Sequence, residues 1–359
     1  MDFGKCTYIS WAKYNESPEI MVQCGDILLV KTGSSYGKCA FVKDLPKEAT
    51  INPQFVVLKH TQIDSKYLTC VLQSSYARQC YDDFVLGTAI PTFTQVVLGN
   101  MYIPLPSIAE QKRIVDSIED WSAFIEQLEF GRLKLQDTIK QAKSKILDLA
   151  IHGKLVPQDP NDEPAAELLK RINPKAEITC DNPHYQNLPS GWCETLLGDV
   201  GTWQSGATPS RLRKDYYNGD IPWLKTGDLN DSVIKSIPET ITKKALEETS
   251  VKLNPTGSVL IAMYGATIGK IGILALPATT NQACCACVNY MCDKMYLFYF
   301  LLANREGFIA MGGGGAQPNI SKEKITNTHI PLPPLSEQYR IVAKIEELFA
   351  QIDKIEASL

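Results

Sequence analysis

The sequence lacks any apolar run of about 18 residues, the length that a transmembrane helix requires. It also lacks an apolar segment behind its first residues, so we expect no secretory signal. No sign of charge dominates, since 36 basic residues face 40 acidic ones, which gives no support to a free-standing binder of polyanions. With 44% hydrophobic and 21% charged residues, the composition excludes collagen, long disorder and a continuous coiled-coil rod.

Motifs of known catalytic sites are missing as well. The sequence contains no Gly-x-Ser-x-Gly, no His-Glu-x-x-His and no convincing cluster of nuclease carboxylates. Its four histidines are scattered and have no partner motif. We therefore expect no catalytic residue in this chain.

Cysteine is abundant, with 11 residues, but the pattern does not indicate a disulfide framework. The number is odd and the spacings are irregular, so a reduced, cytoplasmic protein is expected. Cys284-Cys285-Ala286-Cys287 lies in an apolar, strand-like run in which only Cys285 and Cys287 share a face. Buried small side chains are favoured there over a zinc site, and we expect no metal in this chain.

The chain contains two internal repeats. Gly25–Lys38 recurs as Gly257–Lys270 at an offset of 232 residues, and each copy is an apolar strand followed by a glycine-bounded loop. Residues 87–115 match residues 314–342 at an offset of 227, with 13 of 29 positions identical. This period is too long for a solenoid unit, so the sequence predicts two copies of one module, each ending in a helix.

Each copy of that helix carries an apolar stripe with steps of four and three residues, which is typical of a coiled-coil seam. The first stripe includes Ile114, Ile118, Trp121, Ile125 and Leu128, and continues to Leu149. The second includes Ile341, Ile345, Leu348, Ile352 and Ile355. We predict that the stripes pair the two helices with each other; the alternative is that each stripe packs only on its own module.

These patterns predict an α+β protein with two mixed α/β modules. The predicted segments are a first module at 1–104, a spacer helix at 105–155, a proline-rich linker with one short helix at 156–188, a second module at 189–333 and a second helix at 334–359. The first module has no counterpart of residues 191–231, and the second helix is much the shorter. We therefore expect a chain truncated at both ends relative to a symmetric two-module protein.

Two loops resemble phosphate-binding loops. Gly33–Lys38 and Gly265–Lys270 each end in Gly-Lys, but three residues separate their glycines where a phosphate loop has four. Neither lysine is followed by the Ser or Thr that would bind magnesium. We therefore favour a tight turn between strands for each loop. For the protein as a whole, two alternative functions remain: a nucleotide-dependent enzyme that uses Gly265–Lys270, and a purely structural coiled-coil scaffold.

Further motifs carry a resemblance to a known family. They are, in chain order, Ala150–Gln158, Gly191-Trp192, Leu197–Val200, Gly206–Pro209, Ile221–Leu224, Tyr264–Lys270, Asn281-Gln282, Gln317–Ile320 and the duplicated Ile-Pro-Leu-Pro and Arg-Ile-Val segments. In this order the chain resembles the specificity subunit of type I restriction–modification systems over essentially its whole length. The resemblance implies two target recognition domains, each reading one half of a split DNA sequence, separated by long antiparallel coiled-coil helices.

The implied function is non-catalytic. The resemblance implies binding of double-stranded DNA, docking of methyltransferase subunits on the helices, and contact with restriction subunits through the complex, without a membrane. S-adenosylmethionine, ATP and Mg²⁺ are expected only in partner subunits, with no cofactor in this chain. The alternative is a truncated or phase-variable half-specificity protein in which only the second recognition domain is competent.

Polar loop residues are the candidate base readers, because Arg and Lys pair with guanine edges and Asn and Gln with adenine. In the first domain the candidates are Lys31, Ser34, Ser35, Tyr36 and Lys38. In the second domain they are Ser210, Arg211, Arg213, Lys214, Tyr216, Lys225, Tyr264, Thr267, Gln317 and Asn319.

The charge distribution qualifies this expectation. Residues 1–104 are neutral overall, and residues 191–333 hold 13 basic against 12 acidic side chains. Phosphate neutralisation supplies most non-specific affinity for DNA, so such modules should bind DNA weakly alone. Our hypothesis is that partner subunits supply much of the phosphate contact while these modules read bases.

Overall fold

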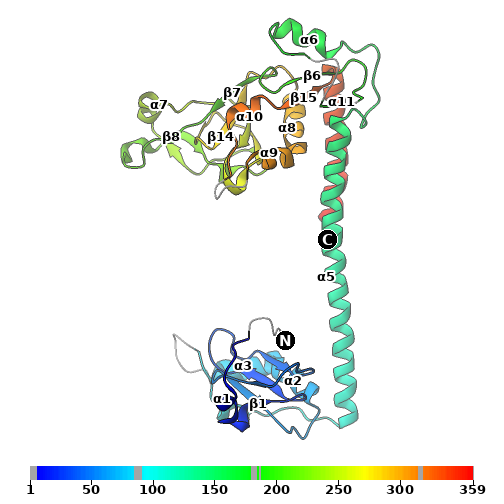
Figure 1. Ribbon diagram of the computed structural model, residues 1–359, viewed down its shortest axis with the longest axis vertical. Helices are drawn as coiled ribbons and strands as arrows, with labels where there is room; N and C mark the ends of the chain where they lie inside the picture. Colours follow the sequence, from blue (N-terminus) through cyan, green and yellow to red (C-terminus); the bar gives the residue numbers. More distant parts are fainter. Residues whose placement is uncertain (1–5, 85–90, 179–183, 186, 314–317, 359) are drawn as a thin grey trace. The chain divides into compact units, whose positions relative to one another are not determined.

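The computed structural model describes residues 6–84, 91–178, 184–185, 187–313 and 318–358. The chain forms two compact units, Met1–Gly131 and Arg132–Leu359, each with its own helices and sheets (Figure 1). The α+β prediction is confirmed. Among the described residues, no helix has both the length and the apolar character needed to cross a membrane.

The first unit has short strands and short helices. Its strands are β1 (Met21–Val22), β2 (Ile27–Val30), β3 (Cys39–Phe41), β4 (Ala49–Thr50) and β5 (Phe55–Leu58). Its helices are α1 (Trp11–Asn15), η1 (Pro18–Ile20), α2 (Ser65–Gln73), α3 (Ser75–Asp83) and α4 (Gln95–Gly99). The main sheet has the antiparallel order β3–β2–β5, and β1 pairs with β4.

The core of the first unit lies between this sheet and α2. Ile27 and Leu29 alternate inward along β2 and pack with Leu68, as a half-buried strand requires. Tyr81 stacks on Phe93 with ring centres 4.8 Å apart. This stack holds the segment after α3 against the sheet.

The second unit is larger. Its strands are β6 (Cys193–Leu196), β7 (Thr202–Ser205), β8 (Tyr217–Leu224), β9 (Ser232–Ile234), β10 (Thr240–Ile241), β11 (Val259–Ala262), β12 (Ile271–Leu274), β13 (Thr279–Thr280), β14 (Cys284–Val288) and β15 (His329–Leu332). Its helices are α6 (Ala165–Ile172), η2 (Lys214–Tyr216), η3 (Thr226–Asp228), α7 (Lys243–Glu248), η4 (Gly265–Thr267), α8 (Lys294–Ala303), α9 (Arg305–Met311) and α10 (Lys322–Thr326).

A five-stranded sheet of order β7–β14–β11–β12–β9 forms the centre of the second unit, and α8 packs on β11 and β12 (Figure 1). Both faces of the sheet are covered, which explains why β11 and β14 are apolar without alternation. Cys285 and Cys287 point into the larger core, and Cys284 into the smaller core on the opposite face. The prediction of buried cysteines, with only Cys285 and Cys287 on one face, is confirmed.

The two long helices are α5 (Ile108–Ile151) and α11 (Leu335–Glu356). Within the second unit, α11 lies along the last turns of α5 (Figure 1). Gln158, just beyond α5, donates to Glu337 near the start of α11 at 3.2 Å, whereas Lys143 forms an ion pair with Asp353 near its end at 2.7 Å. These two contacts fix the antiparallel direction, as predicted.

The predicted seam needs correction along much of its length. Ile341 and Ile345 are fully buried and Leu348 and Ile352 are half-buried, but Ile355 is 51% exposed. On α5 the core contains Leu147 and Ala150, and Ile146 of the predicted stripe packs against it. The five predicted on α5 lie elsewhere: Ile118, Trp121, Ile125 and Leu128 are 42–65% exposed, and Ile114 packs against Tyr67 and Val71 in the first unit.

The physical reason is length. The 22-residue helix α11 spans about 33 Å, and its first turn lies beside Gln158, beyond the end of α5. It therefore ends beside Lys143, before reaching the turns that carry the exposed stripe.

One buried hydrogen-bond arrangement occurs in both units. Gln111 and Gln338 lie 227 residues apart and are 1% and 0% exposed. Gln338 accepts from the backbone N–H of Asp293 at 2.7 Å and donates to the Pro333 carbonyl at 2.9 Å. Gln111 makes the equivalent bonds with Asp64 and Pro106, at 2.9 and 2.9 Å. The repeated sequence therefore forms the same hydrogen-bonded joint in both units, in which one buried glutamine connects the start of a long helix to its domain.

Candidate DNA interface

The two predicted loops are hairpin turns with the same backbone hydrogen bonds. Gly33–Lys38 joins β2 to β3, and Gly265–Lys270 joins β11 to β12. The matching pairs of N–H donor and carbonyl acceptor are Gly33 to Pro91 and Gly265 to Pro318, Gly37 to Val30 and Gly269 to Ala262, and Val30 to Lys38 and Ala262 to Lys270. Gly33, Gly37, Gly265 and Gly269 all have φ between 63° and 94°, which suits glycine. The internal repeat is therefore a structural repeat.

These hydrogen bonds argue against a phosphate-binding loop. The N–H groups of Gly265, Ile268, Gly269 and Lys270 all donate to backbone carbonyls of the protein. A phosphate loop needs such donors directed at the ligand. A tight turn, as the spacing favoured, is what the structure contains.

At the tip of the β11–β12 hairpin, three predicted readers lie together. Tyr264 and Asn319 form an isolated antiparallel bridge, and Thr267 donates to the Tyr264 carbonyl at 2.8 Å. The side chain of Tyr264 is 42% exposed, and Asn319 is also exposed. Gln317, predicted with them, lies outside the described residues.

A second group of predicted readers surrounds a small aromatic core in the second unit. Arg211 lies over the rings of Tyr217 and Trp223, at 4.4 and 4.9 Å from their centres, and forms an ion pair with Glu239. Lys225 forms an ion pair with the same carboxylate at 2.7 Å. The hydrogen bond from Arg211, together with that from Lys225, lowers the pKa of Glu239.

Arg213 is held in a similar way. It donates two hydrogen bonds to Asp215, at 2.8 and 2.7 Å, and lies 4.4 Å from the ring centre of Tyr216. The hydrogen bonds from Arg213 and Lys244 hold the pKa of Asp215 well below its usual range. Tyr216 is buried and donates to Glu248 at 2.9 Å.

The remaining candidates of the second unit are exposed. Ser210 uses its carbonyl to accept from the Arg213 N–H at 3.0 Å. Lys214 and the hairpin residue Lys270 are exposed and have no ion-pair partner among the described residues. These two lysines can therefore approach a phosphate without first leaving a carboxylate.

In the first unit, Tyr36 is fixed rather than free. Its hydroxyl donates to Asp82 at 2.5 Å, which raises its pKa, and its ring lies 4.1 Å from the Arg78 guanidinium. Ser34, Ser35 and Lys38 are exposed at the hairpin, and Lys31 is half-buried beside it.

The arrangement separates two kinds of cation. Arg211, Arg213 and Lys225 are neutralised by carboxylates of their own domain. Sequence spacing did not reveal the partner of Arg211 and Lys225, because Glu239 is distant along the chain. Contact with a base would require these side chains to leave their carboxylates. Lys38, Lys214 and Lys270 remain available to phosphates.

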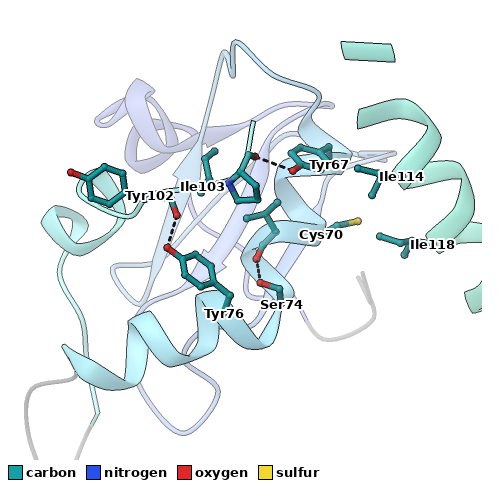
Figure 2. Close-up of a pocket in the computed structure, with 10 residues that line it drawn as sticks. Tyr67, Cys70, Ser74, Tyr76, Tyr102, Ile103, Ile114 and Ile118 are labelled. Atoms are coloured by element: carbon teal, nitrogen blue, oxygen red, sulfur yellow. Dashed lines mark hydrogen bonds between the residues drawn. The ribbon is translucent and has the colours of Figure 1, made fainter. Parts of the chain in front are cut away.

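The first unit also has an open apolar groove of about 560 Å³ (Figure 2). Ile114 and Ile118 of α5 face it, opposite Tyr67 and Cys70 of α2. The counterparts of Tyr67, Ile114 and Ile118 in the second unit are Tyr296, Ile341 and Ile345, which are 0–1% exposed. They belong to a core that also contains Trp192 and the end of α5. The groove is thus the uncovered equivalent of a packed core.

Comparison with known proteins identifies the fold and the family. A family model described as the type I restriction modification DNA specificity domain matches residues 8–136 and 189–359. The specificity subunit of the type I restriction enzyme EcoR124I/EcoR124II of Escherichia coli is 30% identical over 158 residues, which are 42% of this chain and 39% of that protein. The EcoAI specificity subunit of Escherichia coli is 27% identical over 278 residues, covering 68% of this chain and 46% of that protein.

Solved structures agree on the fold. The crystal structure of the HsdS subunit from Thermoanaerobacter tengcongensis has a TM-score of 0.57 at 20% identity and covers 95% of this chain and 77% of its own. A chain from work on complex assembly and conformational transition of the type I R-M system has a TM-score of 0.67 at 21% identity. The match covers 96% of this chain and 79% of that chain. The matches span less than half the length of the two curated relatives named above.

Proposed function

Because the chain belongs to the type I restriction modification DNA specificity domain family, we propose that it is the non-catalytic, sequence-reading subunit of a type I restriction–modification complex. One recognition domain lies in each unit, and each reads one half of a bipartite target on double-stranded DNA. The duplicated hairpin, with its identical backbone hydrogen bonds in both units, is the observation that carries this proposal.

The cations give the proposal its chemistry. Lys38, Lys214 and Lys270 contact phosphates, whereas Arg211 and Arg213 read bases only when DNA replaces their carboxylate partners. Because the charges of each module nearly cancel, the chain alone binds DNA weakly, and partner subunits provide further phosphate contacts. S-adenosylmethionine, ATP and Mg²⁺ act in those partner subunits, and the complex works in the cytoplasm.

DNA binding as a function of salt tests the proposal. We expect Lys214→Ala in the full chain, with its methyltransferase subunit, to reduce the salt slope of DNA binding by about 1. Glu239→Gln releases Arg211 and Lys225 and should raise the slope by about 1–2. Lys354→Ala, on the exposed face of α11, is the matched control and should leave the slope unchanged.

Two outcomes contradict the proposal. Nanomolar binding by the isolated chain with a steep salt slope would overturn the division of phosphate contacts between subunits. Footprints that show no sequence preference in the presence of the methyltransferase subunit would overturn base recognition itself and favour a structural scaffold.

We propose that the methyltransferase subunit docks on the first unit. Trp121, Phe124, Ile125 and Leu128 expose an apolar stripe on α5, and the groove beside Ile118 continues it. Contiguous apolar surface of this kind marks an interaction site. Restriction subunits join through the assembled complex.

A second candidate is a half-specificity protein in which only the second recognition domain reads DNA. The small core of Tyr216, Trp223, Ile241, Ala245 and Val251 supports it, since the first unit has no counterpart of this cluster among its described residues. A footprint over one half-site alone would favour this candidate, whereas a bipartite footprint would exclude it.

A further inference from the structure

Two histidines and a glutamate lie together at the β6–β15 strand pair of the second recognition domain. Glu194 lies on β6 and His329 on β15, and these strands pair antiparallel with Pro331 opposite Glu194. His329 and Glu194 are therefore diagonal neighbours on one face of the strand pair. His184 reaches the same face from the segment before β6.

The polar atoms of the three side chains converge. Nδ1 of His184 and Nδ1 of His329 lie 2.6 and 2.7 Å from the same oxygen, Oε1 of Glu194. The two imidazole rings stack with their centres 3.6 Å apart. One ligand atom from each residue lies within 4.8 Å of the other two.

The hydrogen bonds of this cluster leave one buried polar atom without a partner. The Glu194 side chain is 0% exposed, and a buried carboxylate requires donors or a compensating positive charge. His184 supplies its ring N–H and, at 3.3 Å, its backbone N–H. The Nδ1 atom of His329 is buried and makes no hydrogen bond, because its approach to Glu194 is not aligned for one.

We propose that His184, Glu194 and His329 bind one divalent transition-metal cation, with Zn²⁺ as the reference ion. Two imidazole nitrogens and one carboxylate oxygen are ligands that Zn²⁺ prefers, and three protein ligands with an open fourth position are common for this ion. Bonds of about 2.1 Å in a tetrahedron require ligand atoms about 3.4 Å apart, so each nitrogen moves less than about 1 Å from Oε1. Because the two rings stack at an interplanar angle of 22°, the more exposed His184 ring also turns, so that both in-plane lone pairs point at the ion. The cation supplies the charge that the buried carboxylate lacks and gives His329 Nδ1 a partner.

The site joins the beginning and the end of the domain. β6 and β15 are the first and last strands of the second unit, and Tyr185, next to His184, donates to the His329 carbonyl at 3.4 Å. A bound cation therefore fastens the segment before β6 to this strand pair. The repeat places Tyr102 at the position of His329 in the first unit, so the site belongs to the second unit alone. This inference replaces the sequence-based expectation of no metal and does not depend on DNA recognition.

Metal titration of the full chain tests the site. The chain is first treated with a chelator and then titrated calorimetrically with ZnCl₂, and with CoCl₂ while the visible spectrum is recorded. We expect one equivalent per chain, cobalt bands without thiolate charge transfer, and a higher melting temperature with Zn²⁺. His184→Gln and His329→Gln should weaken binding by more than about tenfold.

A nearby histidine provides the control. His152→Gln removes an imidazole whose ring centre lies 5.8 Å from that of Tyr185 but which is outside the cluster, and it should bind Zn²⁺ like the unmodified chain. The His184 side chain is 53% exposed and glutamine keeps an N–H donor for Glu194, so we expect His184→Gln to retain the fold. Absence of binding at one equivalent, equal affinity in His184→Gln and His329→Gln, or thiolate bands with cobalt would each overturn the proposal.

Discussion

Gln338 accepts a hydrogen bond from the backbone N–H of Asp293 and so ties the start of α11 to the start of α8. The same amide donates to the carbonyl of Pro333, which precedes α11. The Gln338 side chain is fully inaccessible, and its bond to Pro333 is buried. The joint between helix and domain therefore depends on one side chain in the second unit, and on Gln111 in the first.

Removing this amide should destabilise the second unit. In Gln338→Ala, an N–H and a carbonyl lose their partner in a buried place, which costs about 1–3 kcal/mol of unfolding free energy. Urea unfolding of the full chain measures the loss. Gln351→Ala, at an exposed position of the same helix, is the control, and an equal effect of both substitutions would contradict the role of the joint.

The α5–α11 seam should depend on its buried half only. Ile345 is 0% exposed, so Ile345→Ala should lower the unfolding free energy by about 2–5 kcal/mol through lost packing and a cavity. Ile355 is 51% exposed on the same helix, and Ile355→Ala should change the unfolding free energy by less than about 0.5 kcal/mol. Thermal unfolding compares the two variants, and similar melting temperatures would show that the seam is not the stabilising contact.

The exposed stripe of α5 should affect binding rather than stability. In Ile125→Lys/Leu128→Lys both positions are already more than half exposed, so the melting temperature should stay unchanged. Affinity for the methyltransferase subunit should fall by about tenfold or more, since charge replaces apolar contact area. Ser122→Lys adds a charge at an exposed polar position and serves as control. Unchanged affinity would refute docking here, and a dimer of the isolated chain that the double variant abolishes would assign the stripe to a second copy.

Thiol labelling should follow burial. Burial raises the pKa of Cys285 to about 12 and that of Cys292 to about 12, so almost no reactive thiolate exists at pH 8. Cys24 is exposed and should react with iodoacetamide in the native chain, whereas Cys285 and Cys292 should react only after unfolding. Mass spectrometry of the labelled peptides shows which of these cysteines has reacted. Comparable labelling rates at Cys24 and Cys285 in the native protein would contradict the described core.

Local signals predicted several elements correctly. The spacing of apolar residues placed a long helix over nearly the same residues as α5, and the proline-rich linker carries its short helix α6 where expected. The stripe was less informative about partners, because heptad spacing shows that a helix has an apolar face but not what covers it. Ile118 and Ile345 occupy equivalent positions in the repeat, yet one is exposed and the other buried.

The sequence by itself determined the repeat, the helices, the family and the absence of recognised catalytic motifs, because these depend on residue order over short distances. Only the tertiary structure decided which charges are free: Glu239 reaches Arg211 and Lys225 from another part of the chain. It also decided that His184 and His329, 145 positions apart, share one buried carboxylate. Strand pairing brings distant residues into contact, and no local pattern in the sequence encodes which ones.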